Sequence, residues 1–317
     1  MAPGGGLGIG DGASDVNRPI KIAVVSDIHY GPTLPSETKL GGQALELLDD
    51  VLEEMIAYGP DLFVELGDRL SDVGVVEDAA RLEELAQRFG RLPCRREHLQ
   101  GNHDIVHLSA ESTAEILGAT IGHRSVIVRD WHLVFWDADP RYGRGLRIAD
   151  ADLEWLERDL ASNDLPAVVF SHVPLGGGSM IGNYYFEGRP EGRAGHLDAE
   201  RARSVMEHSG RVVLALAGHV HWNSLNVIDG SYYVTIQSLS ESFTTPPHAA
   251  AAWAALELAR ERITVRIHGR DPFEVILRPK PIGSHWIVPR ARTRDASTSS
   301  ATGAGTSIDN GAFGTDQ

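Results

Sequence analysis

Five short blocks of polar residues follow strand-like runs in this chain, and they constrain its fold more than any other feature. The first run, residues 20–25, is apolar and rich in β-branched residues, and it leads directly to Asp27 and His29. Such a run is typical of a buried parallel strand that presents side chains at its carboxyl end. The other blocks are, in chain order, Gly67 with Asp68, residues 101–104 (Gly-Asn-His-Asp), His172, and Gly218 with His219 and His221.

The side chains in these blocks are carboxylates, imidazoles and one amide oxygen, with no cysteine among them. These donors suit manganese, iron or zinc, and they argue against a structural zinc or copper(I) centre. Any single block occurs by chance, and a lone histidine is more often a hydrogen-bonded structural residue. Five blocks in order, each after a strand-like run, instead favour a shared site for divalent metal ions.

Together the blocks resemble the signature of the calcineurin-like metallophosphoesterase superfamily, D-x-H, G-D, G-N-H-[E/D], H and G-H-x-H, over residues 20 to about 222. The resemblance implies two divalent metal ions that share the bridging ligand Asp68. One ion is expected on Asp27, His29, Asp68 and His221, and the other on Asp68, Asn102, His172 and His219. The resemblance also implies a catalytic histidine outside the ligand set, His103, with Asp104 in the position of the carboxylate that orients it.

Two metal ions suit phosphoester hydrolysis, because they offset the negative charge of the phosphate and activate water. A hydroxide held between them attacks phosphorus in line with the leaving oxygen. His103 is expected to stabilise or protonate that oxygen, since an unperturbed imidazole has a pKa near 6.5. The alternative is that His103 only binds phosphate.

The periodicity predicts helices interleaved with strands early in the chain and successive strands later. Helices are expected over residues 43–58, 75–89, 151–160 and 198–208, with Asp198 as N-cap of the last. Further strands are expected over residues 124–128, 133–137, 224–228, 232–237, 250–258 and 263–267. With the resemblance, this order implies an α/β fold, a four-layer α/β/β/α sandwich of two mixed sheets with the metal loops gathered at one edge.

Composition favours one catalytic domain, residues 20–288, between disordered tails over residues 1–19 and 289–317. The net charge of −15 argues against an extended nucleic-acid partner and favours a small phosphorylated substrate. The single cysteine, Cys94, gives no sign of an oxidising compartment, so we expect a cytoplasmic protein. No apolar stretch is long enough for a membrane span.

Substrate contacts are expected from two places. Residues 173–197 follow His172 and contain Tyr184, Tyr185 and Arg189, which we expect to contact the part of the substrate beyond the phosphate. The alternative is a surface loop whose aromatic side chains only anchor it. Arg69, next to Asp68, is expected to contact a phosphate oxygen, the alternative being a structural salt bridge.

We therefore expect a hydrolase of a small phosphodiester, since the Asn-His-Asp ending resembles the cyclic-nucleotide phosphodiesterase branch of the family. A phosphomonoesterase acting on a small metabolite is the second alternative, and a binding scaffold without catalysis is the third. The oligomeric state is open, because a late strand such as residues 232–237 either pairs across a dimer or completes the second sheet.

Overall fold

The computed structural model describes residues 18–34, 37–141 and 145–287. The chain divides into two units, residues 1–285 and 286–317, and every element below belongs to the first. The tails predicted over residues 1–19 and 289–317 lie outside the described residues, except for Arg18 and Pro19. Within the described ranges, no helix has both the length and the apolar character that crossing a bilayer requires.

The first sheet contains six strands in the order β12-β11-β10-β1-β2-β3. Their bounds are β1 (Ile20–Val25), β2 (Leu62–Glu65), β3 (Arg95–His98), β10 (Trp253–Ala259), β11 (Arg262–His268) and β12 (Phe273–Leu277). Strands β1, β2 and β3 are parallel, with Val24 opposite Val64 and Val64 opposite Glu97, whereas β10 to β12 run antiparallel. The carboxyl ends of the three parallel strands therefore share one edge.

The second sheet also has six strands, in the order β4-β5-β6-β7-β9-β8. Their bounds are β4 (Arg124–Val128), β5 (Trp131–Phe135), β6 (Ala167–Ser171), β7 (Val212–Ala217), β8 (Ser224–Ile228) and β9 (Ser231–Thr235). Strands β5, β6, β7 and β9 are parallel, so β6 and β7 also end at one edge. Strand β9 lies between β7 and β8, and residues 231–235 thus complete this sheet.

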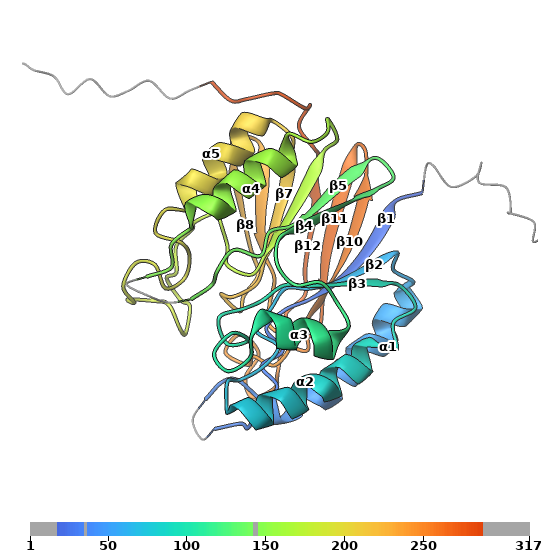
Figure 1. Cartoon of the computed structure of the whole chain (residues 1–317), viewed down its shortest axis with the longest axis vertical. Coiled ribbons are helices and arrows are strands. Elements are labelled where there is room, and N and C mark those ends of the chain that lie inside the picture. Colours follow the sequence, from blue (N-terminus) through green and yellow to red (C-terminus); the bar gives the residue numbers. More distant parts are fainter. Residues whose placement is uncertain (1–17, 35–36, 142–144, 288–317) are drawn as a thin grey trace, which may run out of the picture. The chain divides into compact units, whose positions relative to one another are not determined.

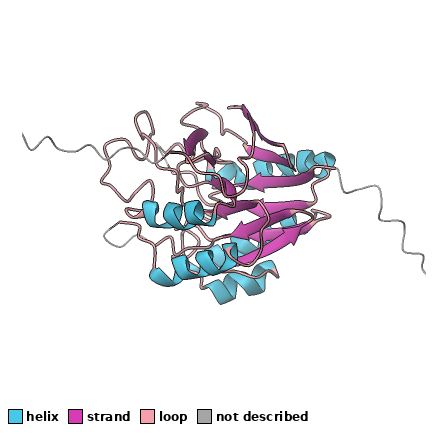
Figure 2. Cartoon of the chain, turned by 90° about the horizontal axis from the view of Figure 1, so that it is seen from above, coloured by secondary structure: helices cyan, strands magenta, loops and turns pink. Residues whose placement is uncertain are grey.

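Helices cover the outer face of each sheet (Figures 1 and 2). The first sheet packs against α1 (Ala44–Tyr58), α2 (Val75–Phe89) and α3 (Ala110–Leu117), and the second against α4 (Asp150–Leu160) and α5 (Ala199–Ser209). A short 3₁₀ helix, Gly41–Gln43, precedes α1. Alternate residues of β1 divide between layers: Ile22 and Val24 face the second sheet, whereas Ala23 and Val25 face the helices. The predicted four-layer sandwich is confirmed.

Most predicted elements lie within a few residues of their observed bounds, and helix α1 ends as predicted at Gly59, whose φ of 69° closes it. Helix α3, strand β12 and the bounds of strand β3 were not predicted, and β3 is polar in place of the strand-like run expected before residues 101–104. Asp198 stands at the N-terminus of α5, but its side chain does not cap that helix. It accepts instead from the backbone N–H of Ile148 at 3.1 Å, and so joins α5 to the segment before α4.

Candidate metal centre

The predicted metal ligands lie directly after five strands, at the edge where parallel strands from both sheets end. Five of them, Asp27, His29, Asp68, His219 and His221, have positive φ angles of 53°, 47°, 54°, 68° and 55°. Such a conformation costs a non-glycine residue about 1–3 kcal/mol and persists only where the surrounding structure enforces it. The backbone is therefore turned so that side chains from separate loops meet.

Close packing of two glycines holds two of these loops together. A Cβ atom on Gly67 would lie 2.5 Å from the backbone nitrogen of Gly101, and a Cβ on Gly101 would overlap the backbone of Asp68. The backbone N–H of Asp27 donates to the carbonyl of Gly67 at 3.0 Å, which attaches the loop after β1 to the loop after β2. The glycines allow the three loops of the first sheet to approach one another.

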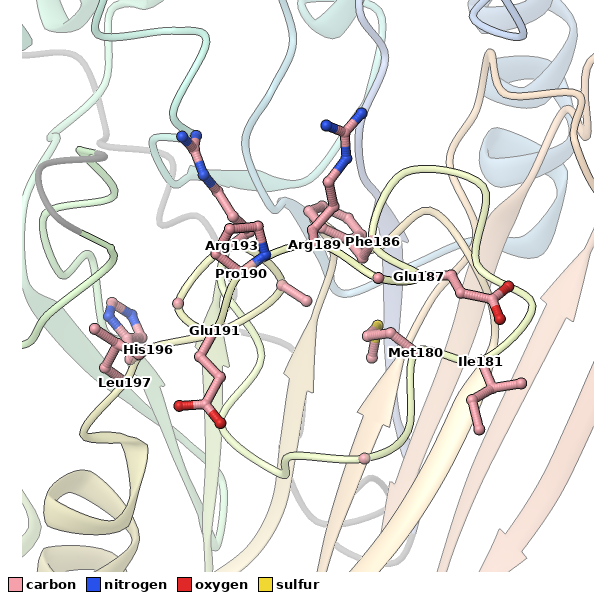
Figure 3. Close-up of a pocket in the computed structure, with 15 residues that line it drawn as sticks. Met180, Ile181, Phe186, Glu187, Arg189, Pro190, Glu191, Arg193, His196 and Leu197 are labelled. Atoms are coloured by element: carbon pink, nitrogen blue, oxygen red, sulfur yellow. The ribbon is translucent and has the colours of Figure 1, made fainter. Parts of the chain in front are cut away.

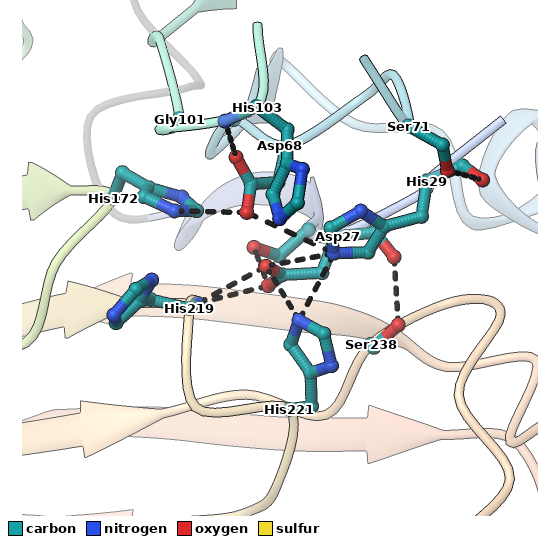
Figure 4. Close-up of polar contacts among 12 residues, drawn as sticks. Asp27, His29, Asp68, Ser71, Gly101, His103, His172, His219, His221 and Ser238 are labelled. Carbon is teal, nitrogen blue, oxygen red and sulfur yellow. Dashed lines mark hydrogen bonds and ion pairs between the residues drawn. The ribbon is translucent and has the colours of Figure 1, made fainter. Parts of the chain in front are cut away.

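The first group of converging side chains is Asp27, His29, Asp68 and His221, all buried (Figure 4). His221 Nε2 lies 3.2 Å from Asp27 Oδ1 and 3.0 Å from His29 Nε2. His29 Nε2 in turn lies 3.7 Å from Asp68 Oδ2. Four donor atoms, from two loops of the first sheet and one loop of the second, thus face a common point.

The second group is Asp68, His172 and His219, also buried. His172 Nε2 lies 3.4 Å from Asp68 Oδ2, and the rings of His172 and His219 are 5.1 Å apart between centroids. Asp68 belongs to both groups, as expected of a bridging ligand. The amide oxygen of Asn102 is buried without a hydrogen-bond partner among the described residues, and Asn102 lines the same cavity as Asp68 and His219.

The hydrogen bonds of His172 show that the site fits a cation. His172 Nδ1 lies 3.0 Å from the carbonyl oxygen of Leu66, so it carries the proton of the neutral ring and donates it there. This leaves a lone pair on Nε2, which has no hydrogen-bond partner among the described residues and faces the Asp68 carboxylate. Two acceptors in contact repel each other unless a cation lies between them. The buried amide oxygen of Asn102 is also an acceptor without a donor, and a cation would satisfy it in the same way.

The protonation states of these side chains also suit a metal ion. Burial would raise the pKa of Asp68, but His172 and His103 lower it well below its ordinary value. Burial lowers the pKa of His219 to about 3, which keeps that imidazole neutral. Burial would lower the pKa of His172, but Asp68 and Asp27 outweigh it and raise the pKa to about 9, so without a metal ion this ring would itself carry a positive charge between the carboxylates. A metal ion bound there would replace that proton and leave the ring neutral. Ionised carboxylates and neutral imidazoles are the forms that bind metals.

His103 lies beside these groups without belonging to either. Its ring is 4.9 Å from that of His29, and its backbone N–H donates to Asp68 Oδ1 at 2.9 Å. The ring nitrogen Nδ1 lies 2.6 Å from Asp72 Oδ1. Its side chain is 28% exposed, so His103 is open to the cavity while the ligand groups are buried. Asp72 therefore orients this imidazole.

Asp104 was expected to orient His103, and this prediction is wrong. The Asp104 carboxylate accepts from the backbone N–H groups of Asp68 and Gly101, each at 2.8 Å, and of Arg69 at 2.9 Å. Its side chain is buried, whereas that of His103 is partly exposed. Asp104 thus holds the loop of Asp68 against the loop of Gly101.

Comparison with known proteins gives the same picture. The family model for calcineurin-like phosphoesterases matches residues 20–223. The chain belongs to that family. A 3',5'-cyclic adenosine monophosphate phosphodiesterase of Escherichia coli is 26% identical over 78% of this chain and 89% of its own length. A probable cyclic nucleotide phosphodiesterase of Synechococcus is 24% identical over 75% of this chain and 88% of its own length.

Solved structures share the fold of this calcineurin-like phosphoesterase at low identity. A dimetal phosphatase of Danio rerio superposes with a TM-score of 0.65, at 16% identity, over 83% of this chain and all of that one. A purple acid phosphatase of yellow lupin gives a TM-score of 0.54, at 14% identity, over 81% of this chain and 54% of that one. The family and the two ligand groups imply an enzyme, a phosphoric ester hydrolase with a dinuclear divalent metal site.

A cavity of about 470 Å³ opens over the metal ligands of this phosphoesterase. We call it the metal-site cavity. Its walls contain, besides Asp68, Asn102, His103, His219 and His221, the side chains of Lys39, Tyr185, Phe186, Arg189, Pro190 and Arg193. Two of the four predicted substrate contacts, Tyr185 and Arg189, therefore lie at the cavity.

The other two predicted contacts lie elsewhere. Tyr184 is 55% exposed, outside the cavity wall, and its ring stacks 6.1 Å from that of Phe243. Arg69 is fully buried, and its Nε donates to Glu65 Oε2 at 2.8 Å. The predicted phosphate contact of Arg69 is therefore wrong. Arg69 instead forms a structural salt bridge with Glu65, which was the alternative.

Glu241 is a residue of the site that sequence reasoning missed. It is fully buried, and its Oε2 lies 3.2 Å from His221 Nδ1, on the side of the ring opposite Asp27. Its Oε1 accepts from the backbone N–H of Ser242 at 2.8 Å. Burial would raise the pKa of Glu241, but His221 outweighs it and lowers the pKa to about 2. A carboxylate on the far nitrogen of a ligand histidine fixes its tautomer and orientation.

Proposed function

We propose that this enzyme hydrolyses a small, nucleotide-like phosphodiester. The observation that carries the proposal is the position of His103, which is partly exposed at the metal-site cavity, hydrogen-bonded through its backbone to Asp68 and paired through its ring with Asp72. An imidazole held beside a metal cluster but outside it is placed to give a proton to a leaving oxygen. Diester hydrolysis needs such a proton, since alkoxides leave poorly.

The metal ligands form part of the same proposal. Seven residues would hold two divalent ions of manganese, iron or zinc: Asp27, His29, Asp68, Asn102, His172, His219 and His221. When bound, such ions act as Lewis acids toward a phosphate and lower the pKa of bound water.

The protein's own groups then account for the proton transfer. Asp72 accepts from His103 Nδ1 and holds the ring with its second nitrogen available to the cavity. His103 Nε2 donates its proton to the departing alcohol oxygen as the bond between phosphorus and that oxygen breaks. Before this step the Asp72 carboxylate faces the protonated, positively charged ring, and after it the ring is neutral and still held by the same hydrogen bond.

The named relatives and the charge of the chain support a small substrate. Both sequence relatives carry names of cyclic nucleotide phosphodiesterases, and each matches over most of its length. The net charge of −15 disfavours long nucleic acids. Cys94 is a free thiol, which is in keeping with the cytoplasmic location that we also propose.

The experiment compares bis(p-nitrophenyl) phosphate with p-nitrophenyl phosphate, using metal-stripped protein refilled with manganese. We expect diester hydrolysis that requires manganese. With 3',5'-cyclic adenosine monophosphate, whose leaving group is an alkoxide, we expect hydrolysis to require His103 as well, with His103→Ala as the control. Hydrolysis of the monoester alone would replace the proposal with a phosphomonoesterase. Absence of both reactions with manganese, iron and zinc would leave the binding scaffold.

A further inference from the structure

Asp78 is a buried carboxylate that belongs to neither metal-binding group. It stands in the first turn of α2 and is 1% exposed. Its Oδ1 accepts from the backbone N–H of Val73 at 3.0 Å, and its Oδ2 lies 2.8 Å from His107 Nδ1. The guanidinium nitrogen Nη1 of Arg81 lies 3.6 Å from Oδ1 and offsets the charge. These partners satisfy the buried carboxylate and fix its position.

The two hydrogen-bond partners of Asp78 belong to the two loops that carry His103 and Asp72. Val73 directly follows Asp72 in the loop after β2, and His107 comes four positions after His103 in the loop after β3. Two contacts therefore join the same two loops. The pair of His103 and Asp72 is partly exposed, whereas the second contact is made by a fully buried carboxylate.

Asp72 needs this support because its backbone is strained. Its φ of 40° is unfavourable for a residue with a side chain and persists only where the surrounding structure enforces it. The residue before it is fixed, since Ser71 Oγ donates to the carbonyl of His29 at 2.8 Å. The residue after it, Val73, is fixed by Asp78. The conformation of Asp72 is thus imposed from both sides.

The turn that carries His103 is held at its far end. The backbone N–H of Val106 donates to the carbonyl of His103 at 3.4 Å, which keeps residues 103–107 compact. His107 is 28% exposed, yet its Nδ1 faces the buried carboxylate of Asp78. A displacement of His107 would therefore move His103 relative to Asp72.

We propose that Asp78 is a positioning residue, which holds Asp72 and His103 in the geometry that proton transfer to the leaving oxygen requires. The described residues that line the metal-site cavity do not include Asp78, so it acts through these two residues. A misplacement of about 1 Å at a catalytic group can cost roughly 100-fold in rate. The inference rests on the proposed function, because it gives Asp78 a role only through His103.

The test compares two diesters that differ in their leaving group. 3',5'-Cyclic adenosine monophosphate releases an alkoxide and needs the acid, whereas bis(p-nitrophenyl) phosphate releases p-nitrophenolate, which leaves without a proton. The kcat of each is measured with manganese-loaded wild type and with Asp78→Asn, whose amide cannot accept both hydrogen bonds. The ratio of kcat for the cyclic nucleotide to kcat for the p-nitrophenyl diester should fall about tenfold in the variant. An unchanged ratio would overturn the inference.

Two other carboxylates serve as matched controls. Glu77→Gln alters the exposed neighbour of Asp78 in the same turn of α2, and so reproduces the change of charge at this helix end. Glu191→Gln alters a carboxylate that points away from Arg189 and Arg193 in Figure 3. Both variants should keep the ratio of the wild type. An equal fall in either variant would attribute the effect to lost negative charge and overturn the inference.

A third comparison separates positioning from a purely structural role. In a His103→Gln background the acid is absent, so adding Asp78→Asn should change kcat for the cyclic nucleotide by less than about twofold. A further tenfold fall would overturn the inference. If Asp78→Asn does not fold, His107→Asn, at a partly exposed side chain, takes its place. It removes one of the two bonds and should lower the ratio about threefold, and an unchanged ratio would overturn the inference.

Failure of the proposed function gives a different result. If the wild type does not hydrolyse the cyclic nucleotide, the proposed function fails, and crystal structures of the wild type and Asp78→Asn test the positioning alone. Loss of the contact between Asp72 Oδ1 and His103 Nδ1 in the variant supports the inference. An unchanged contact overturns it.

Discussion

Asp72 Oδ1 lies 2.6 Å from His103 Nδ1, and this pair lies next to the bridging carboxylate Asp68. Asp72 has a positive φ of 40°, which turns its side chain back toward the ligand loop. The pairing gives His103 a fixed orientation and an anion to balance its protonated form. Asp72 comes four positions after Asp68, so the loop after β2 supplies both a metal ligand and the partner of the proposed acid.

Loss of His103 should abolish most of the activity without loss of metal. His103→Gln should lower kcat for 3',5'-cyclic adenosine monophosphate, whose leaving group is an alkoxide, by about 10²–10⁴-fold, the usual contribution of a general acid. Manganese content, measured by mass spectrometry after dialysis, should equal that of the wild type. A variant that keeps its kcat would show that His103 only binds phosphate.

Asp72→Asn should have a smaller effect of the same kind. The amide cannot neutralise the protonated imidazole, and loss of a hydrogen bond to a charged group costs about 1.5–3 kcal/mol. We expect kcat to fall about 10- to 100-fold with little change in KM. Asp130→Asn, in the turn between β4 and β5 where Asp130 pairs with Arg260, serves as control. An equal loss in that variant would point to a general effect on folding.

Glu241→Gln should weaken metal binding. The Glu241 carboxylate fixes the ring of His221, and removal of such partners typically costs 10- to 100-fold in metal affinity. Calorimetric titration of metal-free protein with manganese measures this directly. Glu261→Gln, in the exposed turn between β10 and β11, is the matched control. Unchanged affinity in the Glu241 variant would contradict the positioning role.

His196 should make stability pH-dependent. Burial lowers its pKa to about 4, below the ordinary 6.5, so the folded protein binds this proton less readily than the unfolded chain does. The stabilising contribution is complete above about pH 6.5 and is lost as the pH falls toward 4, by about 3 kcal/mol in all. In the His196→Gln variant, the unfolding free energy measured with urea should therefore depend less on pH over this range. The variant of the exposed His208, His208→Gln, should keep the pH dependence of the wild type. If unfolding free energy depends on pH equally in His196→Gln and in the wild type, His196 is not the cause.

Asn183 should hold the segment of Tyr185 and Arg189 at the metal-site cavity. Its Oδ1 accepts from the backbone N–H of Tyr185 at 3.0 Å, in addition to its bond to Val220. Asn183→Ala leaves these buried groups without partners and should cost about 1–3 kcal/mol in unfolding free energy. Hydrogen exchange should accelerate in residues 183–193. Asn226→Ala removes a more exposed amide bond, to Gly177, and should change neither quantity.

The sequence was most informative where apolar periodicity and polar blocks coincide. Strand β7 is a continuous apolar run and β1 is interrupted only by Lys21, so both their type and the position of the ligands after them could be predicted. Strand β3 is different, because its sequence Arg-Arg-Glu-His is polar and it forms the edge of its sheet. Strand β12 is likewise an edge strand with an alternating exposed face, and helix α3 has only eight residues.

The errors in the site have a different cause, namely the direction of individual side chains. Arg69 and Asp104 each follow a predicted site residue, yet both point into the protein. Asp72 and Glu241 reach the site through turns that no periodic pattern marks. The sequence identifies which loops gather at the metal site, whereas the partners of each side chain depend on backbone turns such as the positive φ of Asp72.

The central claim is that Asp68 joins two metal-binding groups into one dinuclear site. The most direct measurement is equilibrium binding of manganese to metal-free protein, followed by electron paramagnetic resonance. The account predicts two ions per chain with a spin-coupled signal, and loss of both the coupling and at least one ion in Asp68→Asn. One ion per chain, or two uncoupled ions whose binding is unaffected by Asp68→Asn, would contradict it.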